Sequence, residues 1–338
     1  MPVVAAPSRP RRLRQFYGRF SLGLMLRSSL AGLFILAVCS RMPAQRRTVA
    51  ITVDDLPYVT EDAKKAPSDE SRMAQEMNRK LLEAFSRHRV PVTGFVIEQG
   101  VRELGASGAE VLKQWVLQGF DLGNHTESHP DINVLSVPRV EEEIVGGERT
   151  FVPLMRAAGR NVEFFRFPMN HTGDTKAKHD AIAAFLSAHG YKVAACTIDN
   201  SDYLFNAAYL RILAKNDGEA ATRLRREYLN YTSLEIDYYA SLNKLVLGYE
   251  PPQVMVLHDN RLNGDTIGSV LRLFERKGYA FVSLGTAQSD AAYSIPDTYI
   301  TEYGPMWGYR WAKEKNVHLN GRLEPDPPGW VLALAKGE

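Results

Sequence analysis

The stretch Val49-Ala50-Ile51-Thr52-Val53-Asp54-Asp55 is a β-branched, apolar run that ends in two adjacent aspartates. Such a run predicts a buried strand of a parallel sheet, with both acids at its carboxyl end, where α/β folds carry their chemistry. The segment His125-Thr126-Glu127-Ser128-His129 follows 70 residues after Asp55. Two histidines four residues apart in a tight helical turn can direct both imidazoles to one point. Together the two segments predict a site for a divalent cation.

Apolar, β-rich runs alternate with amphipathic stretches along the chain, which predicts a parallel sheet covered by helices. Helical spacing of apolar residues is clear in Glu70–Arg89 and is repeated in Ala109–Gly119. The expected fold class is α/β, a distorted (β/α)7-type TIM-like barrel with acids and histidines at the carboxyl ends of its strands. Seven strands are expected, at Thr48–Val53, Val92–Ile97, Phe120–Gly123, Val162–Phe167, Lys192–Ile198, Val254–Leu257 and Ala280–Leu284.

Two regions exceed what such a barrel needs. Residues 205–250 are charged and rich in tyrosine, and they predict a helical insertion of two helices broken near Asn216-Asp217-Gly218. Residues 285–338 form a C-terminal extension with three of the four tryptophans, Trp307, Trp311 and Trp330. These aromatics either stack on a ligand at the mouth of the barrel or pack the extension against it, and packing is the commoner role of an aromatic side chain.

Residues 1–45 predict a leader rather than part of the fold. They hold seven arginines and no acid, and the apolar run Leu30–Val38 follows Arg27. A basic region before a short apolar core is typical of a secretory signal peptide, so we expect an exported protein, periplasmic or secreted. A lipid anchor at Cys39 or a retained N-terminal anchor is the alternative.

The charge balance of the chain changes once the leader is set aside. Residues 46–338 hold 34 basic and 39 acidic residues, a net charge of −5. A nucleic-acid partner is therefore not expected, and no stable protein partner is predicted either. Without Cys39, Cys196 has no partner for an internal disulfide, and its apolar neighbours predict a buried strand position. The length suits one large catalytic domain, residues 46–284, followed by the extension.

The residue types at the strand ends fit hydrolytic chemistry. Asp55, His125 and His129 would make a two-histidine, one-carboxylate metal site with one position left open, as catalytic zinc requires. Side chains alternate along a strand, so Asp54 is expected to point away from Asp55 and to act as a general base. Other strand ends also carry polar residues. His258 is a candidate general acid, and Arg166 is a cation that can hold an ionised aspartate. Asp199 and Asp202 follow a further strand.

Five segments, in this order, resemble the five motifs of the polysaccharide deacetylases, the NodB-homology domains of carbohydrate esterase family 4. They are Thr52-Val53-Asp54-Asp55, His125-Thr126-Glu127-Ser128-His129, Arg166-Phe167-Pro168-Met169-Asn170, Asp199-Asn200-Ser201-Asp202-Tyr203 and Leu257-His258. Each segment is short, but the ordered set is specific and spans most of residues 46–284. The resemblance implies metal-dependent removal of N-acetyl, or sometimes O-acetyl, groups from sugars, with an acetylated carbohydrate as substrate.

The resemblance also implies a role for each matched residue. By resemblance, Asp54 matches the catalytic base of the family and His258 matches its catalytic acid. Arg166 matches the arginine that orients the base, and Asp202 matches the acid that tunes the catalytic histidine. Asp55, His125 and His129 match the metal ligands of the family. The expected metal is Zn²⁺, and Co²⁺, Ni²⁺ or Mn²⁺ are the alternatives. Four residues match substrate-binding positions of the family: Met169, Asn170, Tyr203 and Leu257. The backbone amide of Met169 would bind the oxyanion, and Leu257 would line an acetyl pocket.

Two residues depart from the family pattern. Asn170 stands where the family has glycine, and asparagine tolerates positive φ, so the turn is expected to survive. Tyr203 stands where the family has tryptophan, which changes the wall of the substrate site. Two alternative functions stay open: hydrolysis of a non-sugar amide on the same fold, and a non-catalytic protein that binds wall polysaccharide. Retention of both Asp54 and His258 argues against the non-catalytic alternative, and the intact His125 and His129 pair, with the exported leader, argues against the non-sugar amide. The resemblance thus implies an enzyme that acts on carbon–nitrogen bonds other than peptide bonds.

Overall fold

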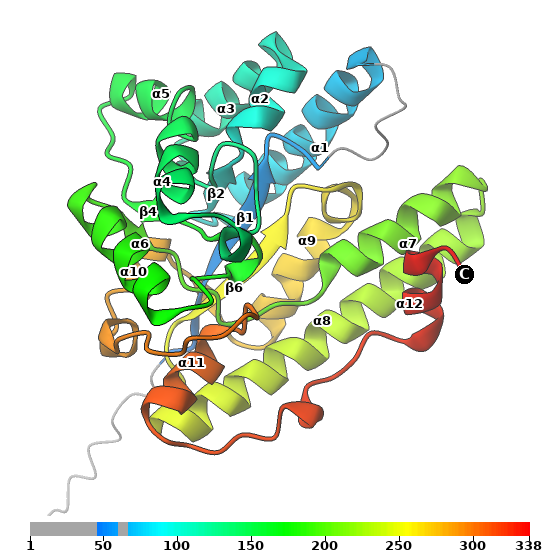
Figure 1. Ribbon diagram of the computed structural model, residues 1–338. Helices are drawn as coiled ribbons and strands as arrows, with labels where there is room; N and C mark the ends of the chain where they lie inside the picture. The colour runs from blue at the N-terminus through cyan, green and yellow to red at the C-terminus, as the bar shows by residue number, and fades with distance from the viewer. Residues whose placement is uncertain (1–45, 60–66) are drawn as a thin grey trace, which may run out of the picture. The chain divides into compact units, whose positions relative to one another are not determined.

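The fold is built on a parallel sheet whose central strand is β1 (Thr48–Leu56). The computed structural model describes residues 46–59 and 67–338. The strands are hydrogen-bonded in the order β5-β4-β3-β2-β1-β6, and β7 also pairs with β1. The other strands are β2 (Thr93–Val96), β3 (Asp121–Asn124), β4 (Phe164–Phe165), β5 (Lys192–Val193), β6 (Gln253–His258) and β7 (Ala280–Phe281). The predicted distorted α/β barrel is confirmed (Figure 1).

The fifth strand is shorter than the predicted Lys192–Ile198, because the chain leaves the regular ladder after Val193. The side-chain amide of Gln288 replaces a neighbouring strand there: its Nε2 donates to the Val193 oxygen at 3.0 Å, and its Oε1 accepts from the Ala195 N–H at 2.9 Å. Ile198 then forms an isolated parallel bridge with Met255 of β6. The barrel is therefore closed by an irregular segment, which accounts for its distortion.

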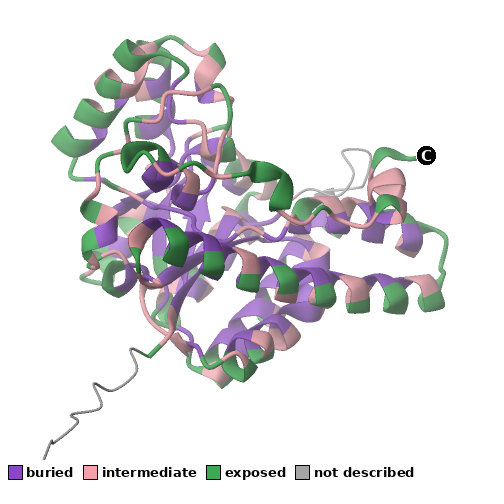
Figure 2. Ribbon diagram, turned by 90° about the horizontal axis from the view of Figure 1, so that it is seen from below, coloured by how far each residue is buried: buried purple, intermediate pink, exposed green. Residues whose placement is uncertain are grey.

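Strand alternation divides the core into an inner and an outer part. Ala50 packs with other inward-facing residues such as Val254 and with Leu284 of α10 (Leu284–Ala287). Val53 and Leu257 belong to the larger cluster between the strands and the helices. Figure 2 shows the buried residues gathered along the strands and on the helix faces that cover them. The covering helices are α1 (Pro67–His88), α2 (Glu98–Leu104), α3 (Ala106–Leu117), α4 (Val137–Gly146), α5 (Phe151–Ala157), α6 (Lys176–Ala188) and α9 (Arg261–Arg276).

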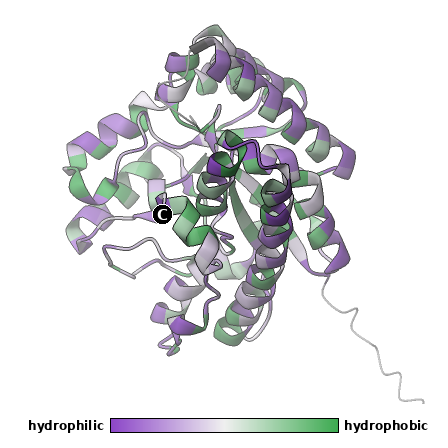
Figure 3. Cartoon of the chain, turned by 90° about the vertical axis from the view of Figure 1, so that its right-hand side faces the viewer, coloured by the Kyte–Doolittle hydropathy of each residue, from purple (hydrophilic) through white to green (hydrophobic). Residues whose placement is uncertain are grey.

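The predicted insertion consists of α7 (Asp202–Ala214) and α8 (Gly218–Leu247). The break falls at the expected residues, and the Asp217 side chain caps α8 by accepting from the Ala220 N–H at 2.9 Å. The helices run side by side, and α12 (Gly329–Lys336) packs on α7 (Figure 1). Figure 3 shows hydrophilic and hydrophobic residues mixed along the helices of the chain, and α8 buries one face, which includes Leu224, Tyr228 and Ile236.

The C-terminal extension packs against the barrel and α8, through α11 (Trp307–Glu314) in particular. Trp307 and Trp311 are buried with Leu242 and Val246 of α8, so these two tryptophans have the packing role. Trp330 is half-buried, with the Arg223 guanidinium 4.6 Å from its ring centroid. The remaining short helices of the chain are η1 (Ile132–Val134), η2 (Pro168–Asn170), η3 (Ala291–Ser294) and η4 (Gly321–Leu323).

The predicted leader, residues 1–45, lies outside the described residues. Among the residues that are described, no helix combines the length and apolar character needed to cross a membrane. Cys196 is fully buried, as expected, and burial raises the pKa of its thiol to about 12.

A buried carboxyl in α8 makes the stability of the fold depend on pH. Glu235 is 1% exposed. Burial raises its pKa to about 8, the nearby Tyr231 hydroxyl opposes this, and the carboxylates of Glu324 and Asp199 reinforce it. Because the folded state holds a proton that the unfolded chain loses above about pH 4.3, stability falls as the pH rises through the range from about 5 to 8.

We expect Glu235→Gln to remove this pH dependence. The variant should be more stable than the wild type at pH 9, by roughly 1–3 kcal/mol, and nearly equal to it at pH 5. Urea unfolding at pH 5, 7 and 9 measures the difference, with Glu227→Gln on the same helix as the control. Parallel stability curves for wild type and Glu235→Gln would show that Glu235 is not the titrating group.

Candidate active site

The carboxyl ends of β1, β3 and β6 meet in one cavity of about 670 Å³. In register, Asp54 of β1 lies beside His258 of β6, and His125 follows directly after β3. The cavity is lined by Asp54, Asp55, Val59, His125, His129, Phe167, Met169, Asn170, Asp199, Tyr203, Asn206, Ala207, Leu210, Val256, His258, Asn260, Gly304 and Met306. The structure therefore brings most of the predicted site residues together.

Asp55, His125 and His129 converge on one point. Asp55 Oδ1 lies 3.5 Å from His125 Nε2 and 3.6 Å from His129 Nε2. One ligand atom from each residue lies within 4.8 Å of the others. Asp55 Oδ1 is buried and makes no hydrogen bond with the described residues. A carboxylate oxygen and two ring nitrogens so placed suit a divalent cation such as zinc.

The backbone reaches this arrangement differently from the prediction. Asp55 has φ +67°, and the pairing of β1 with β2 shifts register between Val53 and Leu56. Strand alternation therefore does not separate the two aspartates, because both line the same cavity. Such an irregularity in a strand redirects a side chain next to a site.

The predicted helical turn at His125–His129 is wrong, since the segment is a loop after β3. Thr126 and His129 have φ +73° and +56°. The loop is fixed by its own polar groups: the Thr126 N–H donates to Asn124 Oδ1 at 2.8 Å, and the His129 N–H donates to Thr126 Oγ1 at 3.0 Å. The two imidazole centroids are 4.8 Å apart, so convergence is achieved without a helix.

Neighbouring groups place both imidazoles in the form that binds a metal. His125 Nδ1 lies 2.8 Å from the Arg166 backbone oxygen. Because that oxygen only accepts, Nδ1 carries the proton and Nε2 presents its lone pair to Asp55. Burial, with a contribution from His125, lowers the pKa of His129 to about 4, so its ring is neutral at pH 7. Burial alone would raise the pKa of Asp55, but its interactions with His125, His258 and His129 hold it well below its usual range. The residues fit a divalent metal.

Asp54 is a buried carboxylate held by a buried cation. It is 4% exposed, and its Oδ2 lies 3.4 Å from Arg166 Nη1 and 3.8 Å from His125 Nε2. Arg166 is fully buried, its Nη2 donates to Thr52 Oγ1 at 3.1 Å, and its guanidinium lies 4.7 Å from the Phe95 ring centroid. Because Arg166 is held by these contacts, it can fix the position of the Asp54 carboxylate, the role that the resemblance implies for it.

Asp202, at the first position of α7, controls His258. Its Oδ1 accepts from His258 Nδ1 at 2.6 Å, and its Oδ2 accepts from the His258 backbone N–H at 2.8 Å. The side-chain amides of Asn260 and Asn263 also donate to this carboxylate. Burial opposes protonation of His258, but the Asp202 carboxylate outweighs it and raises the pKa of His258 well above its usual value. The protonated form of His258 is therefore favoured, and this form can donate a proton into the cavity.

Met169 and Asn170 form a left-handed turn at the edge of the cavity. Both have φ +54°, and Asn170 adopts the positive φ that its residue type tolerates. The Met169 N–H makes no hydrogen bond with any described residue. Met169 is 46% exposed and Tyr203 is 54% exposed, and the ring centroids of Tyr203 and His258 are 6.2 Å apart. A backbone donor without a partner among the described residues thus belongs to a residue that lines the cavity.

Leu257 is not placed as the sequence suggested. It is buried in the outer cluster between the sheet and the helices, while Val256, one residue earlier, lines the cavity. Because side chains alternate along β6, the residue next to His258 faces away from it. Val256 therefore takes the position that was expected for Leu257.

Two parts of the cavity wall were not predicted from the sequence. Ala207 and Leu210 share one face of α7 with Tyr203, and the helical spacing i, i+4, i+7 could have indicated them. Gly304 and Met306 belong to the C-terminal extension. No local pattern in the sequence shows that this segment returns to the barrel mouth.

The site combines an α/β barrel with three side chains that are placed to hold one divalent cation. Residues 41–194 match the family model described as polysaccharide deacetylase. Over these residues the chain is similar to the polysaccharide deacetylase family. The matched segment contains Asp54, Asp55, His125, His129 and Arg166, whereas Asp202 and His258 lie beyond it.

Curated relatives agree with this family. A chitooligosaccharide deacetylase of Bradyrhizobium sp. (strain ANU 289) is 33% identical over 69 residues, 20% of this chain and 30% of the relative. A chitooligosaccharide deacetylase of Sinorhizobium fredii (strain NBRC 101917 / NGR234) is 27% identical over 109 residues, 32% of this chain and 48% of the relative. The chain thus spans less than half the length of each of these two relatives.

Among solved structures, peptidoglycan deacetylase PdaC from Bacillus subtilis is similar, with 16% identity and a TM-score of 0.44, over 72% of this chain and 91% of the other. BA3943 from Bacillus anthracis, a CE4 family pseudoenzyme, has 13% identity and a TM-score of 0.46, over 72% of this chain and 66% of the other.

Proposed function

We propose that the chain is a metal-dependent hydrolase that removes N-acetyl groups, with O-acetyl esters as a secondary substrate type, from a polysaccharide or oligosaccharide. One observation carries the proposal. Asp55, His125 and His129 converge within 4.8 Å in a cavity that also holds Asp54 and His258. The match of residues 41–194 to the polysaccharide deacetylase family model supports an acetylated carbohydrate as the substrate class. Zinc is the proposed metal, with cobalt, nickel or manganese as alternatives.

A divalent ion held by these three ligands would polarise the acetyl carbonyl and lower the pKa of water. The residues of the chain carry the proton transfers. Asp54, oriented by Arg166, accepts a proton from the attacking water, and the Met169 N–H donates to the developing oxyanion. His258 then gives its proton to the leaving nitrogen while Asp202 holds its other ring nitrogen. The products are acetate and a free amine on the sugar.

Catalysis is favoured over a purely binding role because the proton acceptor and the proton donor are both present and correctly supported. Asp54 and His258 each have a buried partner, Arg166 and Asp202 respectively. A protein that only bound polysaccharide would have no need for two such supported groups in one cavity.

Release of acetate from N-acetylated chitooligosaccharides and from acetylated wall polysaccharide tests the function. We expect release by the metal-replete protein, its loss after chelation and its recovery when the metal is restored. Acetate release that persists at full rate in a metal-free protein would refute the metal-dependent mechanism. No release from either class of acetylated sugar would refute the proposed substrate class.

Replacement of Asp202 by asparagine should move the pH dependence of the reaction. The carboxylate raises the pKa of His258, and the protonated ring is the active form, so activity is lost as the pH rises through that pKa. In Asp202→Asn this loss should occur at a pH lower by at least about one unit, with kcat reduced about 10- to 100-fold. A pH–kcat profile measures both changes. An alkaline limb at the wild-type pH would show that His258 is not the titrating acid.

Export of the protein is also proposed, on the basis of the leader composition alone. Fractionation of cells that express the full chain should find the protein outside the cytoplasm, and deletion of residues 1–45 should retain it inside. An anchor, at Cys39 or through the uncleaved leader, would leave it in the membrane fraction. Equal distribution of the full and the shortened chain would contradict export.

A further inference from the structure

The Met169–Asn170 turn has few hydrogen bonds of its own. The Asn170 N–H donates to the Phe167 oxygen and the His171 N–H donates to the Pro168 oxygen, each at 3.1 Å. Two successive residues with side chains nevertheless hold φ +54°. Such a conformation is maintained only when surrounding structure enforces it. The C-terminal extension contacts this turn at two residues, Arg310 and Gly304.

Arg310 of α11 reaches the turn from the extension. It is 1% exposed, and its Nη2 donates to the backbone oxygen of Asn170 at 2.8 Å. Its Nη1 donates to Thr172 Oγ1 at 3.0 Å and to Asp297 Oδ2 at 2.7 Å, and its Nε donates to the Pro305 oxygen at 3.1 Å. The guanidinium thus joins the segment after the turn to the extension.

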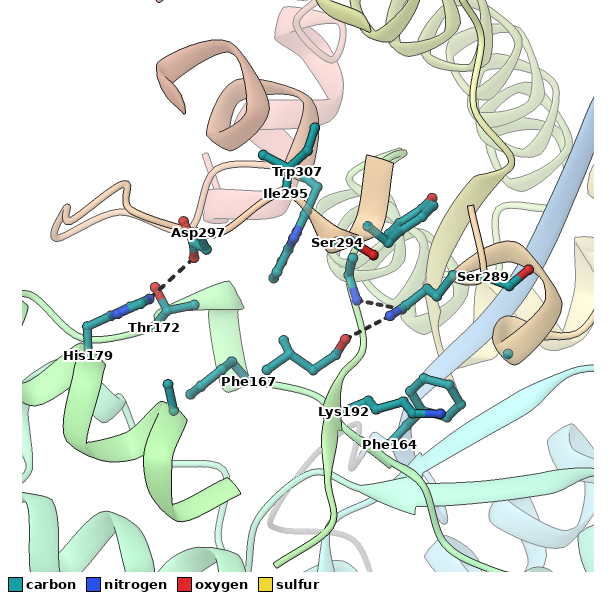
Figure 4. A pocket seen from close by; sticks show the side chains of 16 residues that line it. Phe164, Phe167, Thr172, His179, Lys192, Ser289, Ser294, Ile295, Asp297 and Trp307 are labelled. Atoms are coloured by element: carbon teal, nitrogen blue, oxygen red, sulfur yellow. Dashed lines mark hydrogen bonds and ion pairs between the residues drawn. The ribbon is translucent and has the colours of Figure 1, made fainter. Parts of the chain in front are cut away.

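The position of Arg310 is fixed by its neighbours. The carboxylate of Asp297 also lies 3.6 Å from His179 Nε2 of α6. Figure 4 shows His179 directed toward Asp297, with Thr172 beside them, at one side of a cavity of about 610 Å³. The centroid of the Trp307 ring lies 4.9 Å from the guanidinium, and the backbone N–H of Trp307 donates to the backbone oxygen of Cys196 at 2.7 Å. The start of α11 is thereby tied to the barrel wall.

Gly304 shows independently that the extension presses on the same turn. A Cβ added at Gly304 would lie 1.8 Å from the Met169 backbone oxygen, so no side chain fits at this position. Gly304 therefore restrains the peptide between Met169 and Asn170, while Arg310 restrains the peptide between Asn170 and His171. Both peptides that follow the Met169 N–H are held in place.

We propose that Arg310 is a positioning residue that holds the left-handed Met169–Asn170 turn and so keeps the Met169 N–H directed into the catalytic cavity. Its catalytic consequence rests on the proposed function, because the N–H would stabilise the oxyanion of the deacetylation reaction. A donor that is already in place when charge develops is worth more than one that must first be ordered. On this account the C-terminal extension is part of the catalytic unit, and Arg310 supports the asparagine that stands at position 170.

The test compares Arg310→Gln and Arg310→Lys with a matched control, Arg47→Gln. The Arg47 guanidinium likewise makes several hydrogen bonds, to Glu250, Tyr279 and the Lys277 oxygen, but next to β7 and away from the turn. Two properties are measured in each folded variant: the steady-state parameters of acetate release, and hydrogen exchange of the Asn170 and His171 amides. Metal content is determined in parallel.

We expect Arg310→Gln to lower kcat about 10- to 100-fold, below the loss of up to about 10³ for a deleted oxyanion donor. KM should change less than about 3-fold, and metal content should stay at the wild-type level, because the metal ligands are not touched. Exchange at Asn170 and His171 should become at least about 10-fold faster. Arg310→Lys, which keeps the charge but not the fork of donors, should be intermediate. Arg47→Gln should lower stability without changing kcat or turn exchange.

Exchange at the wild-type rate in folded Arg310→Gln would overturn the proposal, and so would a loosened turn with kcat unchanged. If Arg310→Gln does not fold, acetate release and amide exchange are measured in Gly304→Ala instead, because the added methyl group displaces the Met169 backbone oxygen. If the wild type releases no acetate, the proposed function fails, and the exchange data still decide whether Arg310 holds the turn.

Discussion

Asp54→Asn is expected to reduce kcat by about 10² to 10⁴-fold while the metal remains bound. The amide has the shape of the carboxylate but cannot accept the proton of the attacking water. Asp54 lies 3.4 Å from Arg166 and is not among the three grouped ligand residues, so its loss should leave metal content unchanged. Steady-state acetate release together with elemental analysis of the same sample measures both quantities.

The control for this experiment is Asp121→Asn. Asp121 begins β3 at the opposite edge of the sheet and is exposed, with Arg160 as its partner. We expect wild-type kcat from this variant. Near-normal turnover in Asp54→Asn, with the metal in place, would rule out Asp54 as the base.

His125→Ala should remove both the metal and the activity. His125 supplies Nε2 to the ligand set, and its Nδ1 is held by the Arg166 oxygen, so its loss takes one of three protein ligands. Changes to residues that merely support metal ligands cost up to about 100-fold in affinity, so loss of a ligand should cost more. Metal content after dialysis and acetate release measure the result.

His189→Ala serves as the matched control, because His189 is exposed at the end of α6 and stacks only on Phe185 among ring contacts of the described residues. It should keep the metal and full activity. Since His125 is buried and its removal can weaken the fold, His129→Ala, at a half-buried ligand, provides the second variant. Stoichiometric metal in both folded ligand variants would place the metal elsewhere.

Periodicity was sufficient for much of the fold. The β-branched run at Thr48–Val53 and the apolar spacing in Glu70–Arg89 predict β1 and α1 within a few residues of their bounds. Each pattern depends on which face of a local element is buried, and this is encoded in neighbouring residues. The short β5 was overestimated, because the partner for its backbone is the side chain of Gln288, more than 90 residues away.

The site was predicted by residue identity better than by geometry. Strand alternation was expected to separate Asp54 from Asp55, yet the left-handed backbone at Asp55 brings both into the cavity. His125 and His129 converge through a loop fixed by Asn124 and Thr126 rather than through a helix. A left-handed backbone conformation at a residue other than glycine has no clear signature in amino-acid composition, so a sequence pattern cannot indicate it.

The contribution of the extension was beyond local prediction for a different reason. Arg310 and Gly304 act on the Met169–Asn170 turn across more than 130 residues of chain. Neither residue lies in a motif, and each gains its role from tertiary packing. The aromatic content of the extension indicated only that it would be packed.

X-ray diffraction from crystals of the metal-replete protein, recorded at the absorption edge of the bound metal, tests the central claim most directly. We predict one anomalous peak at about 2.0–2.2 Å from Asp55 Oδ, His125 Nε2 and His129 Nε2 together. A peak bound by other residues, or none near these three side chains in a protein that releases acetate, would contradict the account.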